Sequence, residues 1–337
     1  RYEERLGQGD LAGVILFKRN IESLEQTVAL NEAIHGAVPV DAPAPLVCID
    51  QEGGPVARLR GLATDLPPMG TLGEHTDPAL CEAIGEMMGK ELWSLGFNVD
   101  FAPVMDVASN PKNPVIGVRS FSEDPQTVAE LSTAFARGMA RSGVLPCAKH
   151  FPGHGDTDID SHLDLPVLDC DRDRLDAVEL VPFRAAIMAK LPLIMSAHLS
   201  LPKLDPEYPA TLSRALLTEL LRSELGFQGV VVSDDLEMGA IAKHYDVESF
   251  VRLGVDAGLD LFLICHDAEK QQCAVETLTS LLDAGGEPAR RIRASAVRNE
   301  RLRRSLPRQF GSVGSNWRAV VRSLEHLALA RQVEGAE

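Results

Sequence analysis

Residues 229–234 read GVVVSD, and the pattern of this stretch decides the fold. A run of valines is typical of a strand that is buried on both faces, and this run turns polar only at its carboxyl end. Longer segments at helical period separate it from similar runs, which predicts a parallel sheet with crossover helices. The other strand candidates are 13–17, 46–50, 98–103, 144–150, 193–199 and 259–266. The helix candidates include 78–95, 125–141, 172–189 and 213–225, the last with Ser213 as N-cap.

Polar residues gather at the carboxyl ends of the predicted strands. They are Asp50, Lys149, His150, His198, Asp234 and His266. In a closed parallel barrel such positions converge on one mouth, whereas an open doubly wound sheet gathers them only beside its switch point. Contributions from five separate strands therefore favour an α/β protein with a single-domain TIM-type (β/α)8 barrel.

The length of the chain suits one such domain. We expect residues 1–337 to form one catalytic barrel domain, for which roughly 250 residues are typical before insertions. The glycine pair at 285–286 precedes an arginine-rich segment at 290–304. We expect C-terminal helices, at about 286–337, to pack on the barrel and close it.

Composition restricts the class of partner. The net charge of -16 repels phosphate backbones and anionic lipid, so we expect no nucleic-acid or membrane partner. The six cysteines include no CxxC pair, which favours free thiols and a reducing compartment. We expect a cytoplasmic monomer, although position 1 is Arg and a leader could precede it.

The segment 148–166, AKHFPGHGDTDIDSHLDLP, has the densest chemistry. It follows a strand, its glycines and prolines forbid regular structure, and it holds four Asp and three His residues. A zinc site built from His150, His154 and His162 with an Asp is one interpretation, although the spacing matches no zincin. An acid/base site on a loop that closes over its ligand is the other.

Two further stretches offer carboxylates at strand ends. In SDD, successive residues face opposite ways, so we expect Asp234 to face the mouth and Asp235 to cap the following helix. In IDQEGGPVARLR, Asp50 and Arg58 form a candidate hydroxyl-binding pair. Arg119 is flanked by apolar residues, and a charge there must be paired or functional.

The strings AKHFPGHGDTDIDSH, IDQEGG, IGVRSFSEDP and VVSDDLEMGAI together resemble glycoside hydrolase family 3. Within that family they resemble the β-N-acetylglucosaminidases of bacterial peptidoglycan recycling, over about residues 13–266. Two positions depart from the family pattern: Pro55 stands where an Arg is frequent, and Glu237 where a Ser is frequent. The second, sandwich domain of larger relatives is not part of the resemblance.

The resemblance implies a retaining exo-β-N-acetylglucosaminidase that needs no cofactor and no metal. It makes Asp234 the nucleophile, His162 the acid/base and Asp160 the residue that orients His162. It implies that the substrate is a small carbohydrate, a muropeptide with terminal β-linked N-acetylglucosamine. The implied sugar-binding residues are Asp50, Arg58, Arg119, Lys149 and His150.

Four alternatives remain open on the sequence. A phosphorylase would use the same residues, because a neutral histidine repels an anionic acceptor less than a carboxylate does. A β-glucosidase of broader specificity, a metal-dependent hydrolase and a sugar-binding module without turnover are the others.

Overall fold

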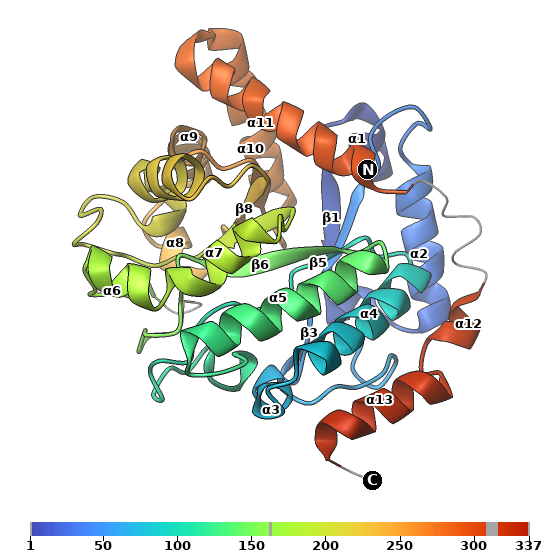
Figure 1. Ribbon diagram of the computed structural model, residues 1–337. Helices are drawn as coiled ribbons and strands as arrows, with labels where there is room; N and C mark the ends of the chain where they lie inside the picture. The colour runs from blue at the N-terminus through green and yellow to red at the C-terminus, as the bar shows by residue number, and fades with distance from the viewer. Residues whose placement is uncertain (1, 162–163, 308–315, 336–337) are drawn as a thin grey trace.

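The computed structural model describes residues 2–161, 164–307 and 316–335. Seven parallel strands form one curled sheet in the order β1-β2-β5-β6-β7-β8-β9, and helices surround it (Figure 1). The strands are β1 (Gly13–Leu16), β2 (Leu46–Ile49), β5 (Val99–Asp100), β6 (Leu145–Phe151), β7 (Leu193–Ser196), β8 (Val230–Asp235) and β9 (Leu261–Leu263), with a separate hairpin of β3 (Gln51–Gly53) and β4 (Val56–Ala57).

The helices follow the strands in alternation. The α-helices are α1 (Tyr2–Gln8), α2 (Leu24–Gly36), α3 (Met69–Glu74), α4 (Pro78–Ser94), α5 (Pro125–Arg141), α6 (Arg172–Ala177), α7 (Leu180–Met188), α8 (Gly239–Ala242), α9 (Val247–Ala257), α10 (Ala268–Ala284), α11 (Gly286–Ser305), α12 (Trp317–Val320) and α13 (Leu324–Glu334). Three 3-10 turns, η1 (Lys18–Asn20), η2 (Gly117–Arg119) and η3 (Ala210–Leu212), and a π-helix, η4 (Ala215–Glu224), complete the set.

The α/β barrel class and the seven strands expected from the sequence are confirmed. Two details differ. No ladder joins β1 to β9 in the described part of the chain, so the sheet is curled rather than closed. The helix expected over 172–189 is interrupted between α6 and α7, where the buried carboxylate of Glu179 turns inward and accepts a hydrogen bond from Arg174 at 3.0 Å.

Two apolar layers hold the barrel together. Side chains such as Phe101, Leu193 and Val232 fill the inside of the curled sheet, and a second layer lies between the strands and the helices. Helices α4 and α5 run side by side on the outside (Figure 1). Gly138 permits this approach, because a Cβ there would lie only 1.9 Å from the carbonyl oxygen of Glu82.

The lower rim of the barrel, at the amino ends of the strands, is tied to α11 through Asp260. One carboxylate oxygen of Asp260 accepts from the backbone N–H of Val231 at 2.8 Å and also pairs with Arg222. The other accepts from Ser295 at 2.7 Å and Arg298 at 2.9 Å, both on α11. The carboxyl end of α11 then places Leu302 and Leu306 in the apolar cluster inside the sheet, so this helix covers the barrel floor.

All six cysteines are free thiols, and four of them, Cys48, Cys81, Cys147 and Cys170, are buried. Within the described residues, no helix combines the length and the apolar character that crossing a membrane requires.

Candidate active site

The carboxyl ends of β2 and β6 bring a carboxylate and an ammonium group together at the mouth. Asp50 directly follows β2, and its two oxygens accept from Arg58 at 2.9 Å and from Lys149 at 3.2 Å. Arg58 directly follows the antiparallel hairpin β3–β4, which begins at Gln51, just beyond the end of β2. Its guanidinium also lies over the ring of Phe17, 5.3 Å from the ring centre. The predicted pairing of Asp50 with Arg58 is therefore present, and Lys149 joins it.

Glu52, on β3, is a buried anion that contacts the same Lys149. Arg119 donates to it in bidentate fashion, with both N–O distances 2.8 Å, and Lys149 Nζ lies 2.5 Å from Oε1. Burial alone would raise the pKa of Glu52, but the charges of Arg119 and Lys149 outweigh it and hold the pKa far below its usual range. The same carboxylate raises the pKa values of Arg119 and Lys149 against the effect of burial.

His150 is held by a buried carboxylate, that of Asp106. The Asp106 oxygens accept from His150 Nδ1 at 2.7 Å and from the backbone N–H of His154 at 2.7 Å. Burial would raise the pKa of Asp106, but the adjacent His150 and these hydrogen bonds bring it below its usual value. Because Nδ1 donates to a carboxylate, Nε2 is the nitrogen left to face a ligand.

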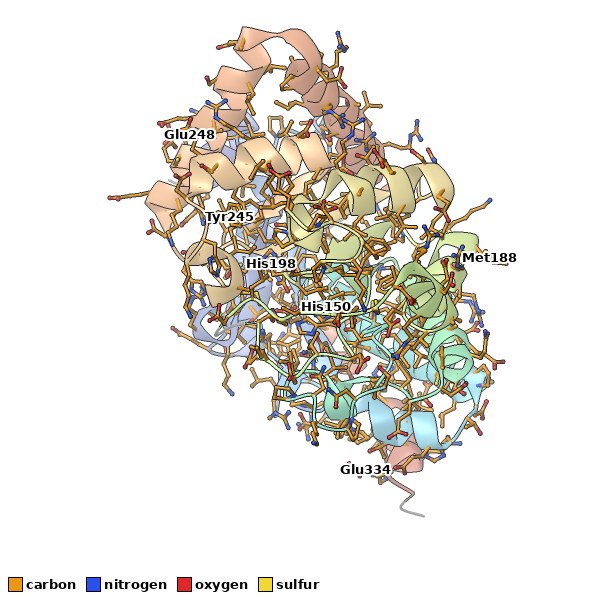
Figure 2. All side chains as sticks on the ribbon, turned by 90° about the vertical axis from the view of Figure 1, so that its left-hand side faces the viewer. His150, Met188, His198, Tyr245, Glu248 and Glu334 are labelled. Atoms are coloured by element: carbon orange, nitrogen blue, oxygen red, sulfur yellow. The ribbon has the colours of Figure 1, made fainter. Side chains whose placement is uncertain are left out.

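Asp234 lies near the carboxyl end of β8, in the same mouth. Its Oδ1 accepts from the backbone N–H of Asp235 at 2.8 Å. Burial would raise its pKa, but the nearby His150, His198 and Lys149 lower it below the usual value, so the group is an anion at neutral pH. Figure 2 shows His150 and His198 in the middle of the molecule, whereas Met188 lies at its edge.

His198 lies two residues beyond the end of β7 and contacts the backbone next to Asp234. Its Nδ1 lies 2.9 Å from Thr211 Oγ1 and its Nε2 lies 3.0 Å from the backbone oxygen of Asp235. Burial lowers the pKa of His198, although the nearby Asp234 acts in the opposite direction.

We call residues 152–161, which follow β6, the histidine loop. It runs from the end of β6 to a contact with α8. Gly155 lets it pass close to the strand-end segment after β5, because a Cβ there would lie 1.6 Å from the carbonyl oxygen of Val107. The side chain of Asn113 then donates to the backbone oxygens of His154 and Gly155 at 2.8 and 3.0 Å. At the far end of the loop, the backbone oxygen of Ser161 accepts from Ala240 of α8 at 3.1 Å.

This last contact matters for the predicted dyad of Asp160 and His162. Asp160 lies in the described loop, where its backbone oxygen accepts from Asp164 at 3.1 Å. His162 lies outside the described residues. Its predecessor Ser161 is hydrogen-bonded to α8, the helix that follows Asp234 in sequence.

One ring nitrogen of each described histidine of the expected zinc site, Nδ1 in both cases, is already engaged. His150 Nδ1 is bonded to Asp106, and His154 Nδ1 lies 2.8 Å from Thr157 Oγ1. Among the described residues, the group closest to metal-ligand geometry is Asp235, Glu237 and His266, whose ligand atoms lie within 4.8 Å of one another. Glu237 there already accepts from the backbone N–H of His266 at 2.6 Å.

Sequence reasoning missed two buried carboxylates, Glu52 and Asp106. Glu52 lies within the quoted IDQEGG string, and Asp106 lies three residues beyond the predicted third strand, 98–103, so both were visible as acids near strand ends. Their roles could not be predicted because their partners are distant in the sequence. Arg119 lies 67 positions from Glu52, and His150 lies 44 positions from Asp106.

A parallel barrel with charged and histidine side chains at the carboxyl ends of its strands is the architecture of (β/α)-barrel enzymes. The chain belongs to glycosyl hydrolase family 3, whose N-terminal domain matches residues 1–302. It is 38% identical over 335 residues to β-hexosaminidase A of Pseudoalteromonas piscicida, covering 92% of this chain and 56% of that protein.

Two other relatives are also similar over most of this chain. The β-hexosaminidase of Stenotrophomonas maltophilia strain K279a is 44% identical over 263 residues, which cover 76% of each chain. The solved structure of a family 3 β-N-acetylglucosaminidase from Paenibacillus sp. str. FPU-7 superposes with a TM-score of 0.89 at 37% identity, covering 98% of this chain and 64% of that one. The chain thus spans 56 to 76% of the length of these relatives.

Proposed function

We propose that this protein is a retaining exo-β-N-acetylglucosaminidase that removes terminal N-acetylglucosamine from muropeptides. The observation that carries the proposal is the meeting, in one barrel mouth, of an ionised Asp234 with the sugar-binding candidates Asp50, Lys149 and His150. The names of the similar proteins, β-hexosaminidase and β-N-acetylglucosaminidase, support the activity.

In the proposed mechanism Asp234 attacks the anomeric carbon while the glycosidic C–O bond breaks. His162, as its imidazolium, protonates the departing oxygen, and the neutral ring then takes a proton from the water that hydrolyses the glycosyl ester of Asp234. Asp160 would fix the tautomer of His162, as a carboxylate does in a catalytic triad.

Asp50, Arg58 and Lys149 would bind sugar hydroxyls, because a carboxylate accepts from a hydroxyl and a cation donates to it. His150 would donate or accept through Nε2, with Asp106 as its positioning residue. Arg119 donates mainly to Glu52 and to the backbone oxygen of Val115 at 3.1 Å. Its proposed contribution to sugar binding is therefore to hold Glu52, and through it Lys149.

Hydrolysis of 4-nitrophenyl N-acetyl-β-glucosaminide tests the proposal. We expect Asp234→Ala to lower kcat by about 10³-fold or more, and added azide to restore turnover with an α-glycosyl azide as the product. His162→Ala should lower kcat/KM by about 10² to 10⁴-fold for substrates whose leaving group is poor. An Asp234→Ala variant with unchanged activity would refute the site.

The same assay separates the alternatives. Phosphate that accelerates turnover and yields N-acetylglucosamine 1-phosphate would identify a phosphorylase. A preference for the aryl β-glucoside would identify a β-glucosidase, and loss of activity on exhaustive chelation would identify a metal enzyme. The muropeptide assignment is tested by release of N-acetylglucosamine from a disaccharide peptide.

We further propose that residues 1–337 form one catalytic domain, which acts as a monomer in the cytoplasm. The six free thiols favour that reducing compartment.

A further inference from the structure

The C-terminal helices pack behind the loop that begins with Arg58. Helices α12 and α13 both contact α4, and α13 also contacts α3 (Figure 1). We call residues 58–66 the Arg58 loop. It follows the hairpin β3–β4, and its first residue is the arginine that pairs with Asp50. The C-terminal helices and the Arg58 loop meet at one buried residue of α4, Glu91.

The carboxylate of Glu91 accepts hydrogen bonds from both sides. Thr64 of the Arg58 loop donates its backbone N–H at 2.8 Å and its hydroxyl at 2.6 Å. From the C-terminal side, the backbone N–H of Arg322 donates at 2.9 Å and His326 Nδ1 donates at 2.8 Å. Burial alone would raise the pKa of Glu91, but these hydrogen bonds bring it below its usual value. Because only 4% of its side chain is exposed, the loss of one donor would leave a buried anion less well satisfied.

The backbone at Arg322, between α12 and α13, has a conformation that arginine rarely adopts. Its φ is 55°, in the left-handed region. In this conformation the N–H donates to Glu91, and the guanidinium donates to the backbone oxygen of Gly61 in the Arg58 loop at 3.2 Å. Such a conformation persists only where its surroundings fix it. The contact is therefore one specific arrangement, not general packing of a helix.

Hydrogen bonds within the Arg58 loop connect Thr64 to Arg58. In the turn of residues 59–63, two N–H groups donate to the backbone oxygen of Leu59 at 2.9 Å. The N–H of Leu59 in turn donates to Gln51 Oε1, on β3, at 3.1 Å. Arg58 immediately precedes this residue. The position of its backbone therefore depends on a short turn whose far end is held by Glu91.

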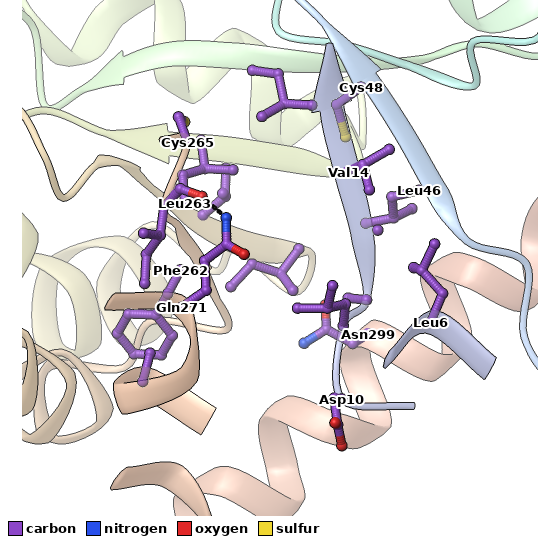
Figure 3. A pocket seen from close by; sticks show the side chains of 18 of the residues that line it. Leu6, Asp10, Val14, Leu46, Cys48, Phe262, Leu263, Cys265, Gln271 and Asn299 are labelled. Carbon is purple, nitrogen blue, oxygen red and sulfur yellow. Dashed lines mark hydrogen bonds between the residues drawn. The ribbon is translucent and has the colours of Figure 1, made fainter. Parts of the chain in front are cut away.

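Packing alone does not hold the Arg58 loop against α4. A cavity of about 10 Å³ remains between them, with Leu59, Thr64 and Glu91 among its walls, which is space for one water at most. The much larger apolar cavity between β1 and β9, about 970 Å³, is separate, because neither the Arg58 loop nor Glu91 lines it (Figure 3).

We propose that α12 and α13 are a positioning element of the sugar-binding site, which acts through Glu91 on the Arg58 loop. His326 and Arg322 fix the carboxylate of Glu91, the carboxylate fixes Thr64, and the loop then holds Arg58 where it meets the sugar hydroxyls. This role rests on the proposed function for one point, that Arg58 binds the sugar. A displaced Arg58 weakens substrate and transition-state binding alike, so its loss of position raises KM and leaves kcat nearly unchanged.

The kinetic test compares two substitutions at one position. His326→Leu removes the donor to Glu91, whereas His326→Asn keeps an N–H close to the place of Nδ1. We expect KM for 4-nitrophenyl N-acetyl-β-glucosaminide to rise about 5- to 10-fold in His326→Leu and less than about twofold in His326→Asn. The control is His35→Leu, which removes a contact of 3.0 Å with the backbone oxygen of Gly96, outside the Arg58 loop. It should leave KM unchanged.

A double-mutant cycle distinguishes action through Arg58 from a general loss of structure. In an Arg58→Ala background, His326→Leu should raise KM no further, because no guanidinium is left to misplace. An equal rise in both backgrounds would overturn the proposal, and so would an unchanged KM in His326→Leu alone. Activity that is unaffected by Arg58→Ala would overturn it as well.

Amide hydrogen exchange tests the same contact without a substrate. We expect exchange at residues 61–64 to become at least about tenfold faster in His326→Leu, but not in His35→Leu. Thr64→Val, which removes the hydroxyl donor to Glu91, should give the same result if His326→Leu does not fold. Unchanged exchange would overturn the proposal whatever the activity. Faster exchange in a protein without glycosidase activity would support the contact and refute the proposed function alone.

Discussion

Glu52 lies between two cations, Arg119 and Lys149, and only 2% of its side chain is exposed. Removing one charge of such a set leaves buried partners uncompensated. We expect Glu52→Gln to lower the free energy of unfolding at pH 7 by about 3 to 5 kcal/mol, measured by urea denaturation. The matched control is Glu248→Gln, which removes the exposed partner of Arg252 and should cost about 0 to 1 kcal/mol.

The pH dependence of that difference follows from the direction of the pKa shift. The folded-state pKa of Glu52 is lowered, so its stabilisation is complete above the unfolded value of about 4.3 and is lost as the pH falls through the folded value. The gap between the wild-type protein and Glu52→Gln should therefore be constant above about pH 5 and shrink under stronger acid. A gap that widens in acid would contradict the assigned role of the carboxylate.

Asp106 provides a second prediction at the residue scale, because it contacts His150 but is itself fully buried. We expect Asp106→Asn to lower kcat/KM by about 10²-fold, because a misdirected imidazole no longer meets the sugar. The loss should appear in KM as well as kcat, and the pH at which kcat/KM is half-maximal should move. A loss fully explained by a smaller folded fraction would reduce Asp106 to a structural role.

At the scale of elements, the histidine loop depends on one close approach to the segment after β5. Gly155→Ala would push the new methyl group into the Val107 carbonyl, so the loop must shift. We expect the free energy of unfolding to fall by about 1 to 3 kcal/mol and kcat/KM to fall by about 10². Gly36→Ala is the control, because a Cβ there meets nothing within 4 Å. Equal activity in both variants would argue that the loop is not positioned by this contact.

The strands were predictable from the sequence because their apolar runs are interrupted by polar residues only at the mouth. The helix break between α6 and α7 was not, because the inward turn of Glu179 satisfies Arg174, and no periodicity records such a pairing. The hairpin β3–β4 was not predictable either, because its strands, three and two residues long, are too short to show a periodic pattern. The candidate site was located from strand ends, but its ion pairs join distant residues and required the structure.

At the scale of the whole molecule, the net charge of -16 acts on any charged substrate. Muropeptides carry carboxylates, so the field opposes their approach, and salt screens it as the Debye length falls from about 30 Å at 0.01 M to about 8 Å at 0.15 M. We expect kcat/KM for an anionic muropeptide to rise about threefold over this range, and that for the neutral nitrophenyl glycoside to stay constant. The same salt response for both substrates would exclude long-range repulsion as its cause.

The contacts of Asp260 lie at one end of the barrel and the candidate active site lies at the other. We expect the two ends to differ in how well they tolerate amino-acid substitutions. Asp260 joins the amino ends of β8 and β9 to α11 through Arg222, Ser295 and Arg298. None of these groups approaches the mouth where Asp50 and Asp234 lie. Natural variation at the mouth can therefore alter which sugar is accepted while the floor preserves the fold. Such an arrangement lets a lineage acquire new specificity by single substitutions, because each intermediate remains folded and available to selection.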